Sequence, residues 1–70
     1  MTAQEFLRRL RKLARKRGVT LVVHASRGKG DHSRLKLGDK VSYLPGMKGE
    51  IRTGTLHAIC RQLGIKEKDL

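Results

Sequence analysis

Apolar residues near the N-terminus recur at helical spacing, at positions Ala3, Phe6, Leu7, Leu10, Leu13 and Ala14. This spacing predicts an amphipathic helix with a single apolar stripe. Thr2 and Glu5 have the spacing of a capping box, in which a hydroxyl and a carboxylate satisfy free backbone N–H groups at the helix start. Gly18 predicts the end of the helix, directly after three cations that suit the negative end of its dipole.

After this helix the pattern becomes that of strands. The β-branched and apolar residues from Val19 to Ala25 predict a first strand. Residues 26–31 form a basic loop interrupted by glycines. From residue 32 to residue 37 polar and apolar positions alternate, so Leu35 and Leu37 share one face of a second strand. The same alternation assigns three polar side chains to the opposite, wet face, namely His32, Arg34 and Lys36.

The next segment reads as a hairpin. Gly38 and Asp39 suit a two-residue turn with glycine in its first position. A third strand is expected over residues 40–44 and ends at Pro45. Its apolar positions do not alternate cleanly, so the pattern leaves its register open. Residues 45–52 are expected to form an irregular loop.

A second helix is predicted to begin at Thr53 or Gly54. Its apolar residues follow helical spacing, at Leu56, Ile59, Cys60 and Leu63. Gly64 predicts its end, Ile65 can fold back onto the last turn, and residues 66–70 are expected to be a frayed polar tail. The whole chain is expected to be one domain, residues 1–70.

The resulting order is helix, three antiparallel strands, helix. Two amphipathic helices can cover one face of a three-stranded meander, and antiparallel sheets tolerate a wet opposite face. The expected fold class is therefore α+β, double-stranded-RNA-binding-like, with both helices on one face of the sheet. A fold by itself does not assign a function.

Charge adds the first functional information. The 70 residues hold 17 Lys and Arg against 6 Asp and Glu, a formal net charge of +11. Such an excess attracts polyanions, most commonly nucleic acid, although a solvated basic surface without a partner stays an alternative. A single cysteine excludes an internal disulfide and fits a reducing compartment. With no apolar segment long enough for a membrane span or a secretory signal, a cytoplasmic location is expected.

Three histidines are candidates for chemistry, and His32 has the most suitable setting. It follows a loop in which Gly28 and Gly30 allow close approach of the backbone to a ligand, and it opens a strand beside Arg34 and Lys36. His24, His57 and the lone Cys60 are more typical of ordinary surface or apolar positions. One cysteine, three scattered histidines and few carboxylates do not match the ligand sets of zinc or magnesium sites, so no metal and no cofactor are expected.

The densest charge lies on the first helix, where seven of the ten residues from 8 to 17 are basic. A phosphate-binding face is the functional interpretation, and a solvated face or a helix lying on an anionic membrane are the alternatives. Because the apolar stripe is needed for the small core, the membrane alternative is disfavoured. The expected RNA-binding residues are Lys29, Arg34, Lys36, Arg8, Arg11, Lys12 and Arg15.

Two short blocks resemble those of HicA toxins. Gly30-Asp31-His32 is similar to the Gly-Ser-His step of that family, and Gly54-Thr55-Leu56 with Ile59, Gln62 and Gly64 is similar to its C-terminal pattern. The resemblance implies a messenger-RNA-cleaving toxin, an endoribonuclease that a HicB-type antitoxin inhibits, with His32 as the catalytic residue. This chain departs from the family at Asp31, where serine is usual.

Two functions therefore remain open. The first is a metal-independent endoribonuclease toxin that uses His32, and the second is a non-catalytic RNA-binding module of the same fold. Only the first needs chemistry, and RNA makes it simple, because the 2′-hydroxyl is a built-in nucleophile that needs a proton acceptor and a cationic clamp. A ribosomal or structural basic protein is a third class, which leaves the spacing of both blocks unexplained.

Overall fold

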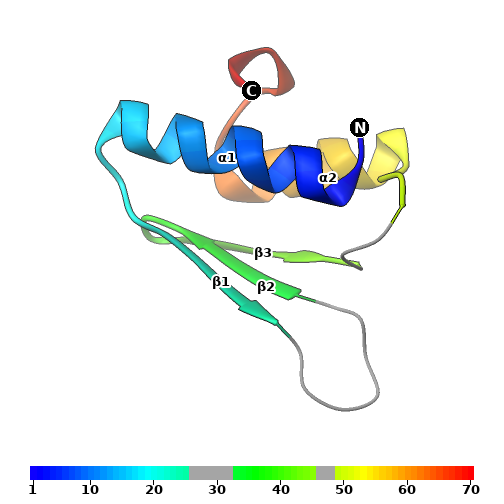
Figure 1. The fold of residues 1–70 in the computed structure, drawn as a ribbon, viewed down its shortest axis with the longest axis horizontal. Coiled ribbons are helices and arrows are strands. Elements are labelled where there is room, and N and C mark those ends of the chain that lie inside the picture. Colours follow the sequence, from blue (N-terminus) through cyan, green and yellow to red (C-terminus); the bar gives the residue numbers. More distant parts are fainter. Residues whose placement is uncertain (26–32, 46–48) are drawn as a thin grey trace.

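The computed structural model of the chain describes residues 1–25, 33–45 and 49–70. The elements follow one another as α1 (Ala3–Arg17), β1 (Leu21–Ala25), β2 (Ser33–Leu37), β3 (Lys40–Leu44), α2 (Thr53–Leu63) and a short 3-10 helix, η1 (Glu67–Asp69). The strands form one antiparallel sheet in the order β1-β2-β3, and α1 and α2 lie on the same side of it (Figure 1). The predicted α-β-β-β-α fold is confirmed.

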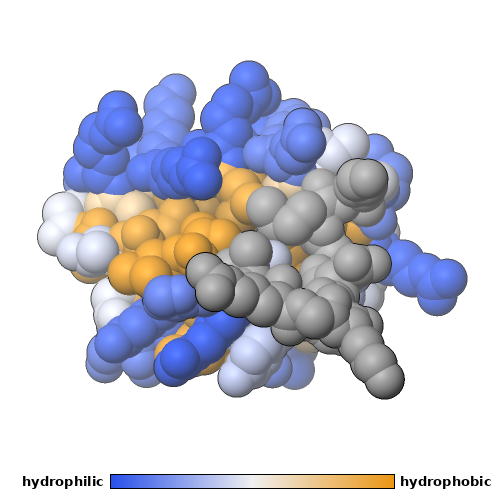
Figure 2. Space-filling model, turned by 60° about the horizontal axis from the view of Figure 1, so that its bottom comes forward, coloured by the Kyte–Doolittle hydropathy of each residue, from blue (hydrophilic) through white to orange (hydrophobic). Residues whose placement is uncertain are grey.

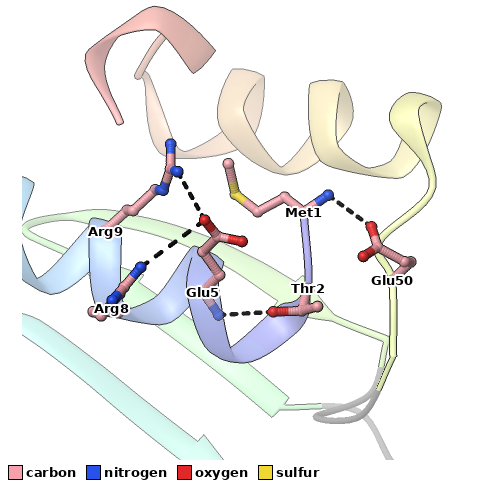
Figure 3. Close-up of polar contacts among 6 residues, drawn as sticks. All are labelled: Met1, Thr2, Glu5, Arg8, Arg9 and Glu50. Atoms are coloured by element: carbon pink, nitrogen blue, oxygen red, sulfur yellow. Dashed lines mark hydrogen bonds and ion pairs between the residues drawn. The ribbon is translucent and has the colours of Figure 1, made fainter.

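Helix α1 begins and ends where the sequence predicts. The Thr2 hydroxyl accepts a hydrogen bond from the backbone N–H of Glu5 at 3.1 Å, and Gly18 ends the helix in the left-handed conformation with φ of 68°. The second half of the expected capping box is replaced by another contact, because the Glu5 carboxylate accepts from the Arg9 guanidinium at 2.7 Å (Figure 3).

Strand β1 begins at Leu21, two residues later than the sequence pattern predicts. The backbone of residues 19 and 20 makes hydrogen bonds outside the β1–β2 pairing. The N–H of Val19 donates to the carbonyl of Ala14 and closes the end of α1, while the carbonyl of Thr20 accepts from Gly38. These two contacts join the end of the helix to the hairpin turn, and the strand can start only after them.

The β2–β3 hairpin fixes the register that the sequence left open. Gly38 and Asp39 form a two-residue turn, since Leu37 pairs with Lys40, and Gly38 has the positive φ of 61° that favours glycine there. From this pair the register continues regularly along both strands. It turns Ser42 and Leu44 of β3 toward the core, where both are buried.

The hydrophobic core lies between the sheet and the two helices. Its buried residues come from both helices, from β2 and β3, and from the segments around α2; they are Ala3, Phe6, Leu7, Leu10, Leu13, Ala14, Leu35, Leu37, Leu44, Ile51, Leu56, Ile59, Cys60, Leu63 and Ile65. Strand β1 is covered less completely, because Leu21 and Val23 pack against this core while only partly buried. Figure 2, in which the bottom of the view in Figure 1 is turned toward the reader, shows apolar surface bordered by hydrophilic side chains.

The C-terminal segment is ordered by contacts, which corrects the expectation of a frayed tail. Ile65 folds back as predicted, with its N–H bonded to the carbonyl of Cys60 at 2.9 Å. Beyond it, η1 is held by an ion pair between Asp69 and Arg17 at 3.2 Å, and Glu67 lies 3.1 Å from His57 of α2. The carboxylates of this polar segment therefore attach it to both helices.

Candidate nucleic-acid interface

Strand β2 separates core side chains from charged ones by strict alternation. Ser33, Leu35 and Leu37 are buried under the helices, whereas Arg34 and Lys36 are exposed. Because successive side chains of a strand point to opposite faces, the two cations lie on the face that no helix covers. This part of the sequence prediction is confirmed. We call this uncovered side of the sheet the open face.

The strand pairing arranges the open face in two rows. Arg34 pairs with His24 of β1 and with Tyr43 of β3, and directly paired residues have side chains on the same face. Lys36 pairs in the same way with Val22 and Val41. The first row lies at the end of the sheet where β1 stops and β2 starts. His24 and Tyr43 are the residues of this site that sequence analysis did not assign to it.

The second cationic surface is the side of α1 that faces away from the sheet. Arg8, Arg11, Lys12 and Arg15, the four cations predicted on this helix, are all exposed. Arg8 lies 3.9 Å from the Glu5 carboxylate (Figure 3). Within the described ranges, the other three have no carboxylate within ion-pair distance. Their charge is therefore free to act on a polyanion.

A groove of about 580 Å³ runs along this helix surface beside η1. Its charged lining comprises Arg8, Arg9, Lys12, Lys16 and Asp69. Arg9 and Lys16 were not among the predicted binding residues. Helical spacing alone could not select them, because their place in the groove depends on where the C-terminal segment packs.

The structure divides the predicted cations that it describes, which exclude Lys29, into two groups. Helix α1 covers the buried face of the sheet, so its outer surface and the open face lie on opposite sides of the core (Figure 1). Arg34 and Lys36 lie together, and the α1 cations lie together, but the two groups do not form one clamp. A nucleic-acid strand that contacts both must pass around the edge of the molecule.

The loop residues expected to hold or cut RNA lie outside the described residues. They are Gly28, Lys29, Gly30, Asp31 and His32. His32 is bonded to Ser33, the first residue of β2, and precedes Arg34 by two positions. Its expected place on the wet face of the strand stays a prediction.

The remaining candidate groups fit structural or surface roles. Cys60 is 3% exposed in the core, and burial raises the pKa of its thiol, with the charge of Glu67 adding to the effect. A thiol of this kind stays protonated and unreactive at neutral pH. His57 is exposed on α2 and faces Glu67, away from the open face.

The described residues contain neither a metal-binding group nor a membrane-spanning helix. Among residues 1–25, 33–45 and 49–70, no three His, Cys, Asp or Glu side chains are grouped so that they could hold a metal ion. No helix in the same part of the chain is long and apolar enough to cross a membrane.

The fold and its two cationic surfaces define a small basic α+β protein suited to a polyanionic ligand. Comparison with protein families then identifies the family. A family model described as HicA toxin of bacterial toxin–antitoxin matches residues 7–65, which is most of the 70-residue chain. The chain belongs to the HicA toxin family, and is thus a toxin with a cognate antitoxin as its partner. Neither the curated proteins nor the solved structures that were compared gave a match.

Proposed function

We propose that this toxin is a metal-independent endoribonuclease that cleaves messenger RNA with His32 as its catalytic residue. The observation that carries the proposal is the match to the HicA family over residues 7–65, a range that includes both the Gly30-Asp31-His32 step and the cations of β2. The open face supports it, because Arg34 and Lys36 are exposed two and four residues after the proposed catalytic residue in the chain.

The chemistry needs few groups. His32 accepts the proton of a ribose 2′-hydroxyl, whose oxygen attacks the adjacent phosphorus. The bond from phosphorus to the 5′-oxygen of the next nucleotide breaks, and that oxygen takes up a proton from the protonated imidazole or from water. The products are a 2′,3′-cyclic phosphate and a free 5′-hydroxyl. Arg34, Lys36 and Lys29 stabilise the negative charge that develops on the phosphate oxygens.

The two cationic surfaces have different roles in this proposal. The open face holds the RNA at the point of cleavage, and the α1 cations attract the chain from a distance and hold its flanking phosphates. The cognate antitoxin is proposed to be acidic where it contacts the toxin and to cover His32. Charge complementarity of that kind favours fast association of toxin and antitoxin.

The decisive experiment compares the natural protein with His32→Ala on a labelled single-stranded RNA in the presence of EDTA. We expect cleavage by the natural protein, products with a 2′,3′-cyclic phosphate, and a loss of about 10²- to 10⁴-fold in rate for the variant. A substrate with 2′-deoxyribose at the cleavage site is expected to bind and to resist cutting.

Circular dichroism of His32→Ala controls for loss of the fold. The proposal is wrong if the folded variant cuts at the natural rate, or if EDTA abolishes cutting by the natural protein. RNA binding without any cleavage by the natural protein would instead support a non-catalytic RNA-binding module.

A further inference from the structure

Tyr43 carries the one exposed six-membered aromatic ring among the described residues. The chain has a single tyrosine, a single phenylalanine and no tryptophan. Phe6 is fully buried in the core, whereas Tyr43 is 60% exposed on β3. The core therefore makes no use of this ring. A single exposed aromatic residue is not by itself a site, so its neighbours decide what it can do.

Those neighbours form a row of three different chemical groups. Tyr43 is paired with Arg34, which is paired in turn with His24, and all three side chains are exposed on the open face. Side chains at directly paired positions have Cβ atoms about 5 Å apart, which is close enough for one ligand to touch a ring and the adjacent guanidinium together. No carboxylate occupies either row of the open face.

The second row extends the same surface along the strands. Lys36 lies two residues from Arg34 on β2, a separation of about 7 Å along the strand. Val22 and Val41 flank Lys36 and are partly buried, so the surface on both sides of this lysine is apolar. A ring at one side and two cations in line make a surface for a planar apolar group attached to a chain of negative charges.

We propose that Tyr43 stacks on a nucleobase of single-stranded RNA while Arg34 binds an adjacent phosphate. The inference rests on the proposed function, since it takes RNA as the ligand of the open face, and it adds a base-binding residue to it. A single strand is required because its bases can leave the stack and lie on an aromatic ring, whereas the bases of a duplex are covered by their neighbours. Stacking accepts every base, so only a weak sequence preference is expected from this contact.

The chain offers a direct readout of this contact. Because Tyr43 is the only tyrosine and tryptophan is absent, all tyrosine fluorescence of the protein comes from this one ring. The probe is a short single-stranded 2′-O-methyl oligonucleotide, which has no free 2′-hydroxyl and cannot be cut by the proposed mechanism. We expect binding to quench the fluorescence. An abasic oligonucleotide of the same length is expected to bind through its phosphates and to quench little, and a duplex is expected to behave like the abasic strand.

Substitutions distinguish the effect of the Tyr43 ring on binding from effects of the fold and of charge. Tyr43→Ala is expected to bind the base-bearing strand about ten-fold more weakly and the abasic strand with unchanged affinity. Tyr43→Phe keeps the ring and should restore binding of the base-bearing strand. Val19→Ala is the matched control, because Val19 is also an exposed apolar side chain, at 39%, but lies beside the hairpin turn at the other end of the sheet.

Equal quenching by the abasic strand, or an unchanged affinity of Tyr43→Ala for the base-bearing strand, would overturn the inference. So would fluorescence that changes with the cognate antitoxin and not with the oligonucleotide, because Tyr43 would then serve a protein contact. The uncleavable probe makes the result independent of catalysis. If His32→Ala shows the proposed chemistry to be wrong, base-dependent quenching still supports the stacking contact.

Discussion

The outer surface of α1 and the open face of the sheet are both cationic, but they are built differently. On α1 the cations are dense, and the residues between them are the buried ones that form the core. Among the described residues, the paired rows of the open face carry two cations, Arg34 and Lys36, set among a phenol ring, an imidazole and two valines. Dense charge attracts any polyanion over a distance, whereas a sparse mixed surface makes contacts that depend on what the ligand is. This difference fits the proposed division of roles, in which α1 attracts the RNA and the open face makes the productive contact.

The largest effect is expected from removing the two cations of the open face. We expect the Arg34→Ala, Lys36→Ala double variant to lose about 10²-fold or more in kcat/KM for RNA cleavage, because these charges face the proposed site of phosphate chemistry. The matched variant is Arg11→Ala, Arg15→Ala, which also removes two exposed cations. Initial rates of cleavage at RNA concentrations well below KM measure the difference. Equal losses in the two variants would remove the distinction between the surfaces.

A smaller effect is expected from reversing charge on the helix. We expect Arg8→Glu, Arg11→Glu, Arg15→Glu to weaken RNA binding by about ten-fold or more at low salt while the maximal rate of cutting stays near that of the natural protein. For single strands, each neutralised phosphate contributes about −0.7 to the slope of log affinity against log salt, so the variant should show a shallower slope. Fluorescence anisotropy over a salt series measures it. An unchanged slope would show that these cations do not contact RNA.

The length of the RNA gives a finer test of the separation. Because the core lies between the two surfaces, a strand of only a few nucleotides should reach one of them and a longer strand both. We expect the α1 reversal to change the affinity of the shortest strands by about two-fold and to have its full effect only on longer ones. A series of uncleavable oligonucleotides of increasing length measures this. An equal effect at every length would mean that one short strand contacts both surfaces.

The smallest effect concerns Cys60 in the hydrophobic core, which lies between the two cationic surfaces. Burial, followed by the charge of Glu67, raises the pKa of the Cys60 thiol above its ordinary value of 9.0. The unfolded chain therefore loses this proton first, so the contribution of Cys60 to stability is present below pH 9 and is lost as the pH rises through the higher pKa of the folded state. Urea unfolding at a series of alkaline pH values measures it. Cys60→Ala should lack this component, and an identical pH dependence in both proteins would contradict it.

Most of the fold could be predicted from the sequence because its signals are local. Periodicity and glycine stops give both helices, and the alternation in β2 gives Leu35 and Leu37 inside with Arg34 and Lys36 outside. Strand β1 was predicted two residues too long, since the backbone of residues 19 and 20 is used by the helix end and the hairpin turn. The hydrogen bond between Gly38 and Thr20 joins distant parts of the chain, so a local sequence pattern does not reveal it.

Sequence patterns placed Arg34 and Lys36 on the open face but did not place His24 and Tyr43 there. The side chains of β3 do not alternate in hydrophobicity, because Val41 and Tyr43 face solvent while Ser42 is buried with its hydroxyl donating to Gln62 at 2.5 Å. A buried serine, a partly buried valine and an exposed tyrosine hide the register. The two-residue turn determines it nevertheless, since pairing of residues 37 and 40 places residue 34 opposite residue 43. The position of His32 relative to these residues remains a prediction.

Because the helices cover only one face of the sheet, the residues of the core and those of the open face are different sets of positions. Six positions face the open side in the two rows, and none of them belongs to the buried core. Substitutions at surface positions of this kind usually alter stability by less than about 0.5 kcal/mol. Under the proposed function, exchanging these six side chains changes the contacts to RNA and leaves the scaffold in place. The cost to folding is smallest at the four exposed positions, His24, Arg34, Lys36 and Tyr43, and larger at Val22 and Val41, which are partly buried.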